Sequence, residues 1–177
     1  MEDIRRTQTP EGVRDYLPAA CAKKRAAERR VMELFARRGF LEVETPLIEY
    51  YDVFSSGVGA IAQEQMFKLF DKEGRILSLR PDVTTPIARL FATKMRDEEL
   101  PQRLCYLGSA FGYDASRAGR ACQFTQAGVE MIGASGPDAD AELVALAIDA
   151  LHEAGVRNFQ MEIGQVDFFK GLMEEAG

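Results

Sequence analysis

Histidine is nearly absent from this sequence, which has one, His152, among its 177 residues. The three cysteines, Cys21, Cys105 and Cys122, are widely spaced, and no CxxC pair occurs. Structural zinc sites need closely grouped cysteine and histidine ligands, and disulfide frameworks need paired cysteines. We therefore expect neither a metal site nor a disulfide. His152 has no nucleophile beside it in the sequence, and we interpret it as structural or solvent-exposed.

Long apolar runs are also missing, since none approaches the roughly 20 residues of a membrane-spanning helix. The opening MEDIRRTQTPEG has no apolar core of a signal peptide, which favours a cytoplasmic protein. The nucleotide-binding patterns GxGxxG and GxxxxGK[ST] do not occur, and we expect no cofactor.

Positive charge is in deficit, because the formal net charge is −6. An acidic chain does not attract nucleic acid by general electrostatics. The one basic concentration, KKRAAERR at residues 23–30, lies in a stretch with a helical pattern. We favour a solvated helix face over a nucleic-acid patch for it.

What is present is typical of one globular domain covering residues 1–177, with 46% hydrophobic and 28% charged residues. Apolar spacing predicts a helix over residues 19–38 that buries Ala27, Val31, Leu34 and Phe35 and ends at Gly39. A strand follows over 39–46, and a hairpin pairs 66–70 with 75–80. Thr85 and Pro86 indicate the start of a second helix.

The second half of the chain predicts two strands, a helix and a further strand. The strands span residues 103–111 and 122–133. The helix opens at Ser135, ends at Gly155 and buries Leu143, Val144, Ala147, Ile148 and Leu151. Residues 158–164 alternate as a last strand, and a helical pattern begins at 167. Because hairpin pairs outnumber βαβ units, we expect an α+β fold with a mostly antiparallel sheet flanked by helices.

Two short segments could carry chemistry. If 122–133 is a strand, Gln126, Gly128 and Glu130 share one face, and a small ligand could lie over the glycine. An edge strand with a wet face explains the pattern equally well. Asp82 and Thr84 precede a helix, where such residues are ordinarily turn and cap residues. Together with Glu130, Asp82 would form an anionic corner suited to an ammonium group.

Four segments, in this order, resemble the class II aminoacyl-tRNA synthetase core, and specifically the histidyl-tRNA synthetases. TPEGVRDYLP is similar to the N-terminal signature, and GFLEVETPLIE to motif 1, which builds that family's dimer interface. LRPDVTTPIAR resembles the substrate-binding loop. RLCYLGSAFGYDASRAGRACQFTQAGVEMIG resembles motif 2 and the strand after it.

The resemblance assigns residues to two sites. Asp82, Thr84, Gln126 and Glu130 stand where the family binds histidine, although Asp82 is shorter than the family's glutamate. The nucleotide site is degenerate. Gly112 replaces the arginine that contacts the ATP α-phosphate, and Cys122 replaces a second arginine. The acidic, basic and adenine-stacking positions of the family's nucleotide site are retained, as Asp114, Arg120 and Phe124. No catalytic residue is expected, because adenylation needs a cation where negative charge develops.

The segment PDVTTP resembles the corresponding segment of a related family, the regulatory subunits of ATP phosphoribosyltransferase. This resemblance implies a non-catalytic subunit that supports the short-form catalytic subunit and its feedback inhibition by histidine, in the first step of histidine biosynthesis. It also implies a hetero-oligomer, histidine as effector, and no tRNA or membrane partner. A self-dimer through the motif 1 region would use Leu34, Phe35, Phe40 and Val43, for which ordinary core packing is the alternative. The sequence is expected to end before motif 3. A divergent histidyl-tRNA synthetase, or a stand-alone binding module, stays open.

Overall fold

A long antiparallel ribbon forms the centre of the structure, a computed structural model that describes residues 7–55, 61–113, 122–164, 170–171 and 173–175. The ribbon pairs β5 (Gln102–Phe111) with β6 (Gln123–Ile132) over their full lengths. The short β1 (Leu41–Glu42) lies parallel to β5 and completes this sheet. The predicted α+β fold with mostly antiparallel pairing is confirmed, and β1 is its one parallel strand among the described residues.

A second, smaller sheet has the strand order β2-β4-β3, all antiparallel. Its strands are β2 (Ile48–Tyr50), β3 (Lys68–Phe70) and β4 (Ile76–Leu79). The predicted hairpin is therefore present as β3 and β4. Two short helical segments precede β3, namely α2 (Asp52–Ser55) and a 3₁₀ turn, η2 (Gln63–Gln65).

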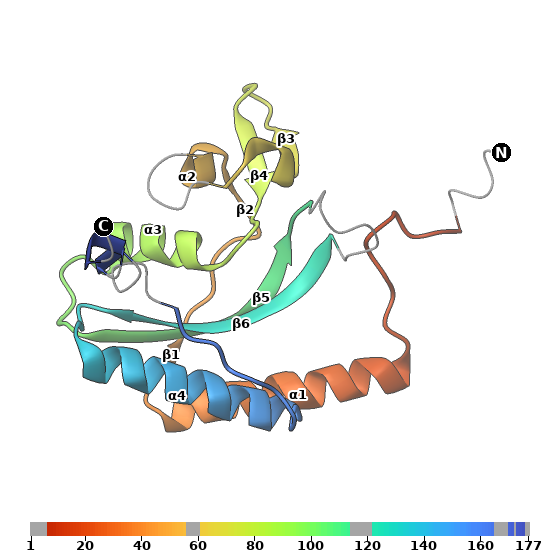
Figure 1. Cartoon of the computed structure of the whole chain (residues 1–177). Coiled ribbons are helices and arrows are strands. Elements are labelled where there is room, and N and C mark those ends of the chain that lie inside the picture. The colour runs from red at the N-terminus through yellow and green to blue at the C-terminus, as the bar shows by residue number, and fades with distance from the viewer. Residues whose placement is uncertain (1–6, 56–60, 114–121, 165–169, 172, 176–177) are drawn as a thin grey trace.

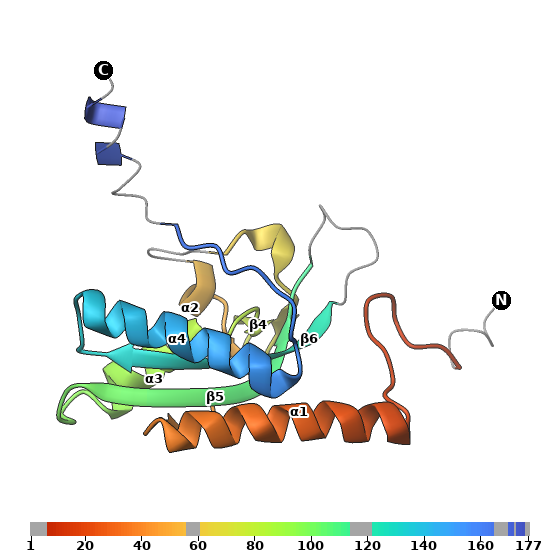
Figure 2. The same ribbon diagram turned by 60° about the horizontal axis from the view of Figure 1, so that its bottom comes forward.

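Helices cover the two faces of the ribbon differently (Figure 1). The long helices α1 (Pro18–Arg37) and α4 (Pro137–Ala154) lie on one face, and the turned view shows them side by side (Figure 2). The shorter α3 (Thr84–Lys94) lies on the other face, together with the small sheet. No helix among the described residues is long and apolar enough to cross a membrane.

Each face of the ribbon has its own core. On the α1–α4 face, Cys105 packs with residues of both helices and the segment after α1: Val31, Leu34, Phe35, Phe40 and Leu146. On the α3 face, the buried cluster consists of Val83, Ile87, Leu104 and Tyr106. The alternation of side chains along β5 explains this division, because Leu104 and Tyr106 point away from Cys105.

The first predicted helix is confirmed as α1, with Val31, Leu34 and Phe35 buried. Gly39 adopts a left-handed φ of 79°, and its amide donates to the carbonyl of Ala36 at 3.0 Å, which ends the helix as expected. The basic residues of 23–30 are partly matched within the helix, since Lys24 and Arg25 both bind Glu28.

The prediction that these residues form an exposed dimer surface is wrong, because their side chains pack in the two cores. Leu34, Phe35 and Phe40 are each 5% exposed or less, and Val43 packs against the α3-side cluster. Ordinary core packing, the alternative, is what the structure shows. The exposed apolar residues of the same stretch are Leu41 and Leu47, at 66% and 48% exposure.

Three further predictions in the second half of the chain fail wholly or in part. The last helix begins at Pro137 behind Gly136, without a side-chain cap from Ser135, although Gly155 ends it as expected. The predicted buried stripe is confirmed for Leu143, which packs on the core, but it misses the buried Leu146 and the neighbouring Ala150. Residues 158–164 are described and form no strand, because alternation alone does not supply a hydrogen-bonding partner.

Candidate functional site

The ribbon places the predicted pocket residues on the α3 face. Gln126, Gly128 and Glu130 of β6 lie opposite Gly108, Tyr106 and Leu104 of β5. Paired residues of an antiparallel ladder point to the same side, so all six share one face. The expectation that Gln126, Gly128 and Glu130 share a face is confirmed.

The loop between β4 and α3 brings the other two predicted residues to this face. Gln126 holds the loop, since its Oε1 accepts a hydrogen bond of 3.1 Å from the Val83 amide. The adjacent Thr84 side chain acts on both groups, since it lowers the pKa of the Glu130 carboxyl and of the Tyr106 hydroxyl against the effect of burial. The neutral side chain of Gln126 therefore joins the loop to β6. The carboxyl groups of Asp82 and Glu130 are close enough for the charge of Asp82 to raise the pKa of Glu130.

Asp82 caps α3, which is the ordinary role considered for it. Its Oδ1 accepts the Thr85 amide at 2.7 Å, and its Oδ2 accepts the Thr85 hydroxyl at 3.2 Å. Thr85 is thus not the cap that the sequence predicted, since the helix starts at Thr84 and the aspartate satisfies the free amide of its first turn. A capping carboxylate can still carry its negative charge toward a ligand.

The electrostatics of this part of the sheet face suit a cation. Burial raises the pKa of the Glu130 carboxyl above its ordinary value, the hydrogen bond from Thr84 opposes this, and the charge of Asp82 raises the pKa further. None of the ion pairs found in the described part of the chain involves Asp82 or Glu130. A ligand ammonium would supply the positive charge that this arrangement lacks.

Sequence reasoning missed Tyr106, which is 5% exposed and lies opposite Gly128. A Cβ atom on residue 128 would stand 2.5 Å from the Tyr106 hydroxyl oxygen, so the phenol ring occupies the space over the glycine. In this structure the ring takes the place over Gly128 that the sequence left open to a small ligand. The alternation along β5 already placed Tyr106 on the pocket face, but only the strand register sets it against a glycine.

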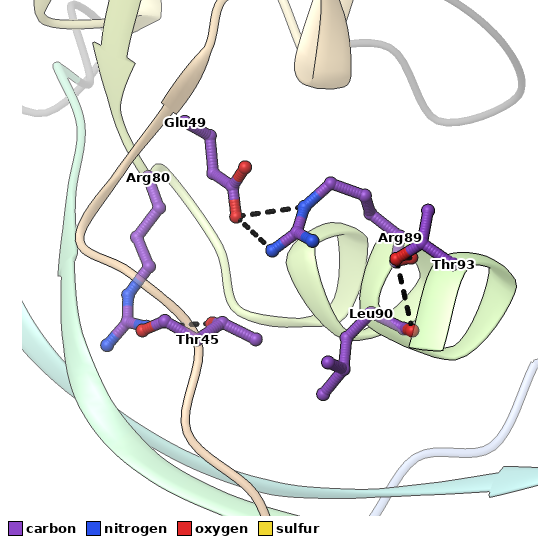
Figure 3. Close-up of polar contacts among 6 residues, drawn as sticks. All are labelled: Thr45, Glu49, Arg80, Arg89, Leu90 and Thr93. Atoms are coloured by element: carbon purple, nitrogen blue, oxygen red, sulfur yellow. Dashed lines mark hydrogen bonds and ion pairs between the residues drawn. The ribbon is translucent and has the colours of Figure 1, made fainter. Parts of the chain in front are cut away.

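Arg80 anchors the base of the loop and is also a residue that sequence reasoning missed. The guanidinium, 4% exposed, donates from Nε to the Ser109 carbonyl at 2.8 Å. Its Nη1 donates to the carbonyl and hydroxyl oxygens of Thr45, at 2.7 and 3.0 Å (Figure 3). Gly108 leaves room for it, because a Cβ there would lie 2.1 Å from Nη2. Burial lowers the pKa of Arg80, but an arginine stays charged in proteins.

A second arginine ties α3 to the small sheet. Arg89 donates from Nε and Nη2 to one oxygen of Glu49, at 3.1 and 2.6 Å (Figure 3). Glu49 lies on the inner side of β2 and is 8% exposed. A buried carboxylate needs such a partner, so this pair fixes the orientation of the helix whose first turn carries Thr84.

The loop end of the ribbon carries the residues of the expected nucleotide site. Gly112 donates its amide to the Cys122 carbonyl at 2.9 Å, which extends the ladder beyond β5 and β6. The Cys122 amide in turn donates to the Gly12 carbonyl at 2.6 Å. Phe124 is exposed on the pocket face, whereas Asp114 and Arg120 lie outside the described residues. Neither Gly112 nor Cys122 brings a positive charge to this end.

Metal-ligating groups are not clustered in the part of the chain that the structure describes. No set of three or more histidine, cysteine, aspartate or glutamate side chains there is arranged to hold an ion. Cys21, Cys105 and Cys122 are all free thiols. Burial raises the pKa of the Cys105 thiol to about 11, so this cysteine is an unreactive core residue.

The fold and this polar face define the class of protein: residues 12–177 match the histidyl-tRNA synthetase family, and the chain belongs to it. Within that family, the chain is 55% identical over 169 residues to the ATP phosphoribosyltransferase regulatory subunit of Acetivibrio thermocellus. The match covers 96% of this chain and 40% of that protein. It is 44% identical to the protein of the same name from Clostridium kluyveri, covering 97% of this chain and 44% of that one.

Solved structures give the same family. The crystal structure of an ATP phosphoribosyltransferase regulatory subunit/histidyl-tRNA synthetase from Bacillus halodurans C matches with a TM-score of 0.86 and 38% identity. That match covers 95% of this chain and 43% of the other. Apo histidyl-tRNA synthetase from S. aureus matches with a TM-score of 0.68 and 32% identity, over 82% of this chain and 39% of that one. The sequence thus spans less than half the length of these relatives.

Proposed function

We propose that the protein is a regulatory subunit of ATP phosphoribosyltransferase that binds histidine and does not activate it. The observation that carries the proposal is the contrast between the two ends of one sheet face. One end has the polar residues Asp82, Thr84, Gln126 and Glu130, whereas the loop end has Gly112 and Cys122 where a synthetase would have arginines. The names of the most similar relatives support this assignment.

The missing charges bear directly on the chemistry. In amino-acid activation a carboxylate attacks the α-phosphate of ATP, so two anions approach each other and negative charge grows in the transition state. Removing one positioned electrostatic donor typically costs about 2.7–4 kcal/mol, or a factor of roughly 10²–10³ in rate. We expect the pair Gly112 and Cys122 to abolish adenylation, leaving Asp114, Arg120 and Phe124 as remnants of a nucleotide site.

The proposal extends to partners. The subunit would act in a hetero-oligomer with the short-form catalytic subunit, in the first step of histidine biosynthesis, with histidine as its feedback effector. It would work in the cytoplasm, without tRNA or a membrane. A self-dimer through the motif 1 region is part of the proposal, and exposed Leu41 and Leu47 are better suited to it than the buried residues first expected.

An exchange assay tests the proposal. The full-length protein that contains this sequence is expected to give no histidine-dependent exchange of pyrophosphate into ATP. Added to a short-form phosphoribosyltransferase, the same preparation is expected to switch on the transferase and make it sensitive to histidine. An authentic histidyl-tRNA synthetase serves as the positive control for exchange. Exchange at synthetase-like rates, or a transferase that stays inactive, would refute the proposal.

A further inference from the structure

Tyr106 lies at the centre of the pocket face and has no part in the function proposed above. The buried ring packs with Val83, Ile87 and Leu104, as an ordinary core residue would. A phenylalanine would fill that role as well. The hydroxyl group is what needs an explanation, because burying it costs free energy unless it is hydrogen-bonded.

Gly128 determines where this hydroxyl lies. The missing Cβ lets the end of the ring approach the backbone of β6, with the positions of the oxygen and Cζ only 2.5 and 2.6 Å from where a Cβ would stand. Since Gln126 and Glu130 flank Gly128 on the same face, the hydroxyl is inserted between the two predicted ligand-binding side chains of β6. Any larger residue at 128 would push it out.

Thr84 connects this hydroxyl to the carboxyl group. Its side chain lowers the pKa of both the Tyr106 hydroxyl and the Glu130 carboxyl, so it acts on the two groups together. A threonine hydroxyl has one proton to donate and can also accept, so one residue can link the two. The charged groups that act on Tyr106 are Glu130, Asp82 and Arg80, of which only Arg80 is positive.

We propose that Tyr106 is a positioning residue, which holds Thr84 and Glu130 in the arrangement that receives a ligand ammonium. The inference rests on the proposed binding of histidine at this pocket. Tyr106 acts through its neighbours, because a side chain that is 5% exposed offers the ligand almost no surface. Gly128 has a part in the same arrangement, because the absence of a Cβ atom there provides the space that the phenol group needs.

Substitutions that keep the ring test the role of the hydroxyl. In the full-length protein, Tyr106→Phe is expected to weaken histidine binding about tenfold, the effect of losing one hydrogen bond of a network. Imidazolepropionate, which lacks the ammonium group, should bind the variant and the wild type alike. Calorimetry with both ligands measures this difference, which a general loss of structure would not produce.

Two variants complete the design. Tyr51→Phe is the matched control, because the Tyr51 hydroxyl is buried and has no hydrogen-bond partner in the described part of the chain. It should leave both affinities unchanged. Gly128→Ala should displace the phenol group and reproduce the loss that is selective for histidine.

The outcomes separate this inference from the proposed function. If the wild type binds no histidine, the effector function fails and the inference fails with it. If the wild type binds but Tyr106→Phe binds equally well, or loses both ligands equally, only the role of Tyr106 is refuted.

Discussion

At the scale of single residues, the pocket shows how one side chain can have a structural and a binding role together. Asp82 caps α3 with both oxygens, and it is also the residue that resemblance assigns to histidine binding. Replacing it therefore changes two properties that must be measured separately. Glu130 differs, because its carboxyl group has Thr84 as its partner and no helix to cap.

Asp82→Ala is expected to lower the free energy of unfolding by about 1 kcal/mol, the usual cost of removing a helix cap. Asp82→Asn should retain most of that stability, because asparagine caps helices about as well as aspartate. Both variants should weaken histidine binding, since both remove the charge. Urea unfolding and calorimetry check the two effects. Equal stability of the two variants would contradict the capping role, and unchanged affinity would place the effector site elsewhere.

Glu130→Gln should make the protein more stable at neutral pH. Burial raises the pKa of Glu130 above 4.5, so the folded state favours the neutral carboxyl group more than the unfolded chain does. As the pH rises through this range, ionisation destabilises the wild type until the pH has passed the raised pKa. The neutral glutamine escapes this loss.

Urea unfolding of wild type and Glu130→Gln across a range of pH measures the effect. The two curves should converge below about pH 4, where the glutamate is protonated in both states. A stability difference that persists unchanged at low pH would show that it comes from packing and not from ionisation.

At the scale of helices and strands, the sequence predicted those elements whose signals are local. The end of α1 follows from Gly39, and the hairpin of β3 and β4 follows from the two strand-like runs at residues 66–70 and 75–80. Residues 158–164 have the same kind of alternation but no partner strand, and a partner cannot be read from the segment itself. For α4 the sequence predicted Leu143 but not Leu146, because the apolar stripe is broad and only packing against α1 and β6 selects Leu146.

The sequence likewise predicted part of the arrangement of the candidate site and missed the rest. The register of β5 and β6 was not needed to place Gln126 and Glu130 on one face, because alternation along one strand is enough. It was needed to find Tyr106, whose role depends on standing across from Gly128. Arg80 was missed for the same reason, since its partners Thr45 and Ser109 are distant in sequence.

At the scale of the whole molecule, the proposed function is a coupling between two binding events. Histidine and the catalytic subunit would each favour particular states of the assembly. By thermodynamic linkage, the factor by which the catalytic subunit changes the affinity for histidine equals the factor by which histidine changes the affinity for that subunit.

We expect this common factor to lie between about 5 and 150, the usual range of such couplings. Calorimetric titrations of histidine, with and without the catalytic subunit, give one factor. Titrations of the catalytic subunit, with and without histidine, give the other. Glu130→Gln should bring both factors toward one. A wild-type factor of one in either titration would contradict a histidine effector that acts through this subunit.

The buried guanidinium of Arg80 has a further consequence for how the chain melts. The two sheets share no strand, yet this side chain binds Thr45 ahead of the small sheet and Ser109 in the ribbon. Its backbone adds a bond from Arg80 to the Leu47 carbonyl and one from Phe111 to the Arg80 carbonyl. Separating the sheets would break these hydrogen bonds together. We therefore expect the small sheet and the ribbon to unfold in one cooperative step.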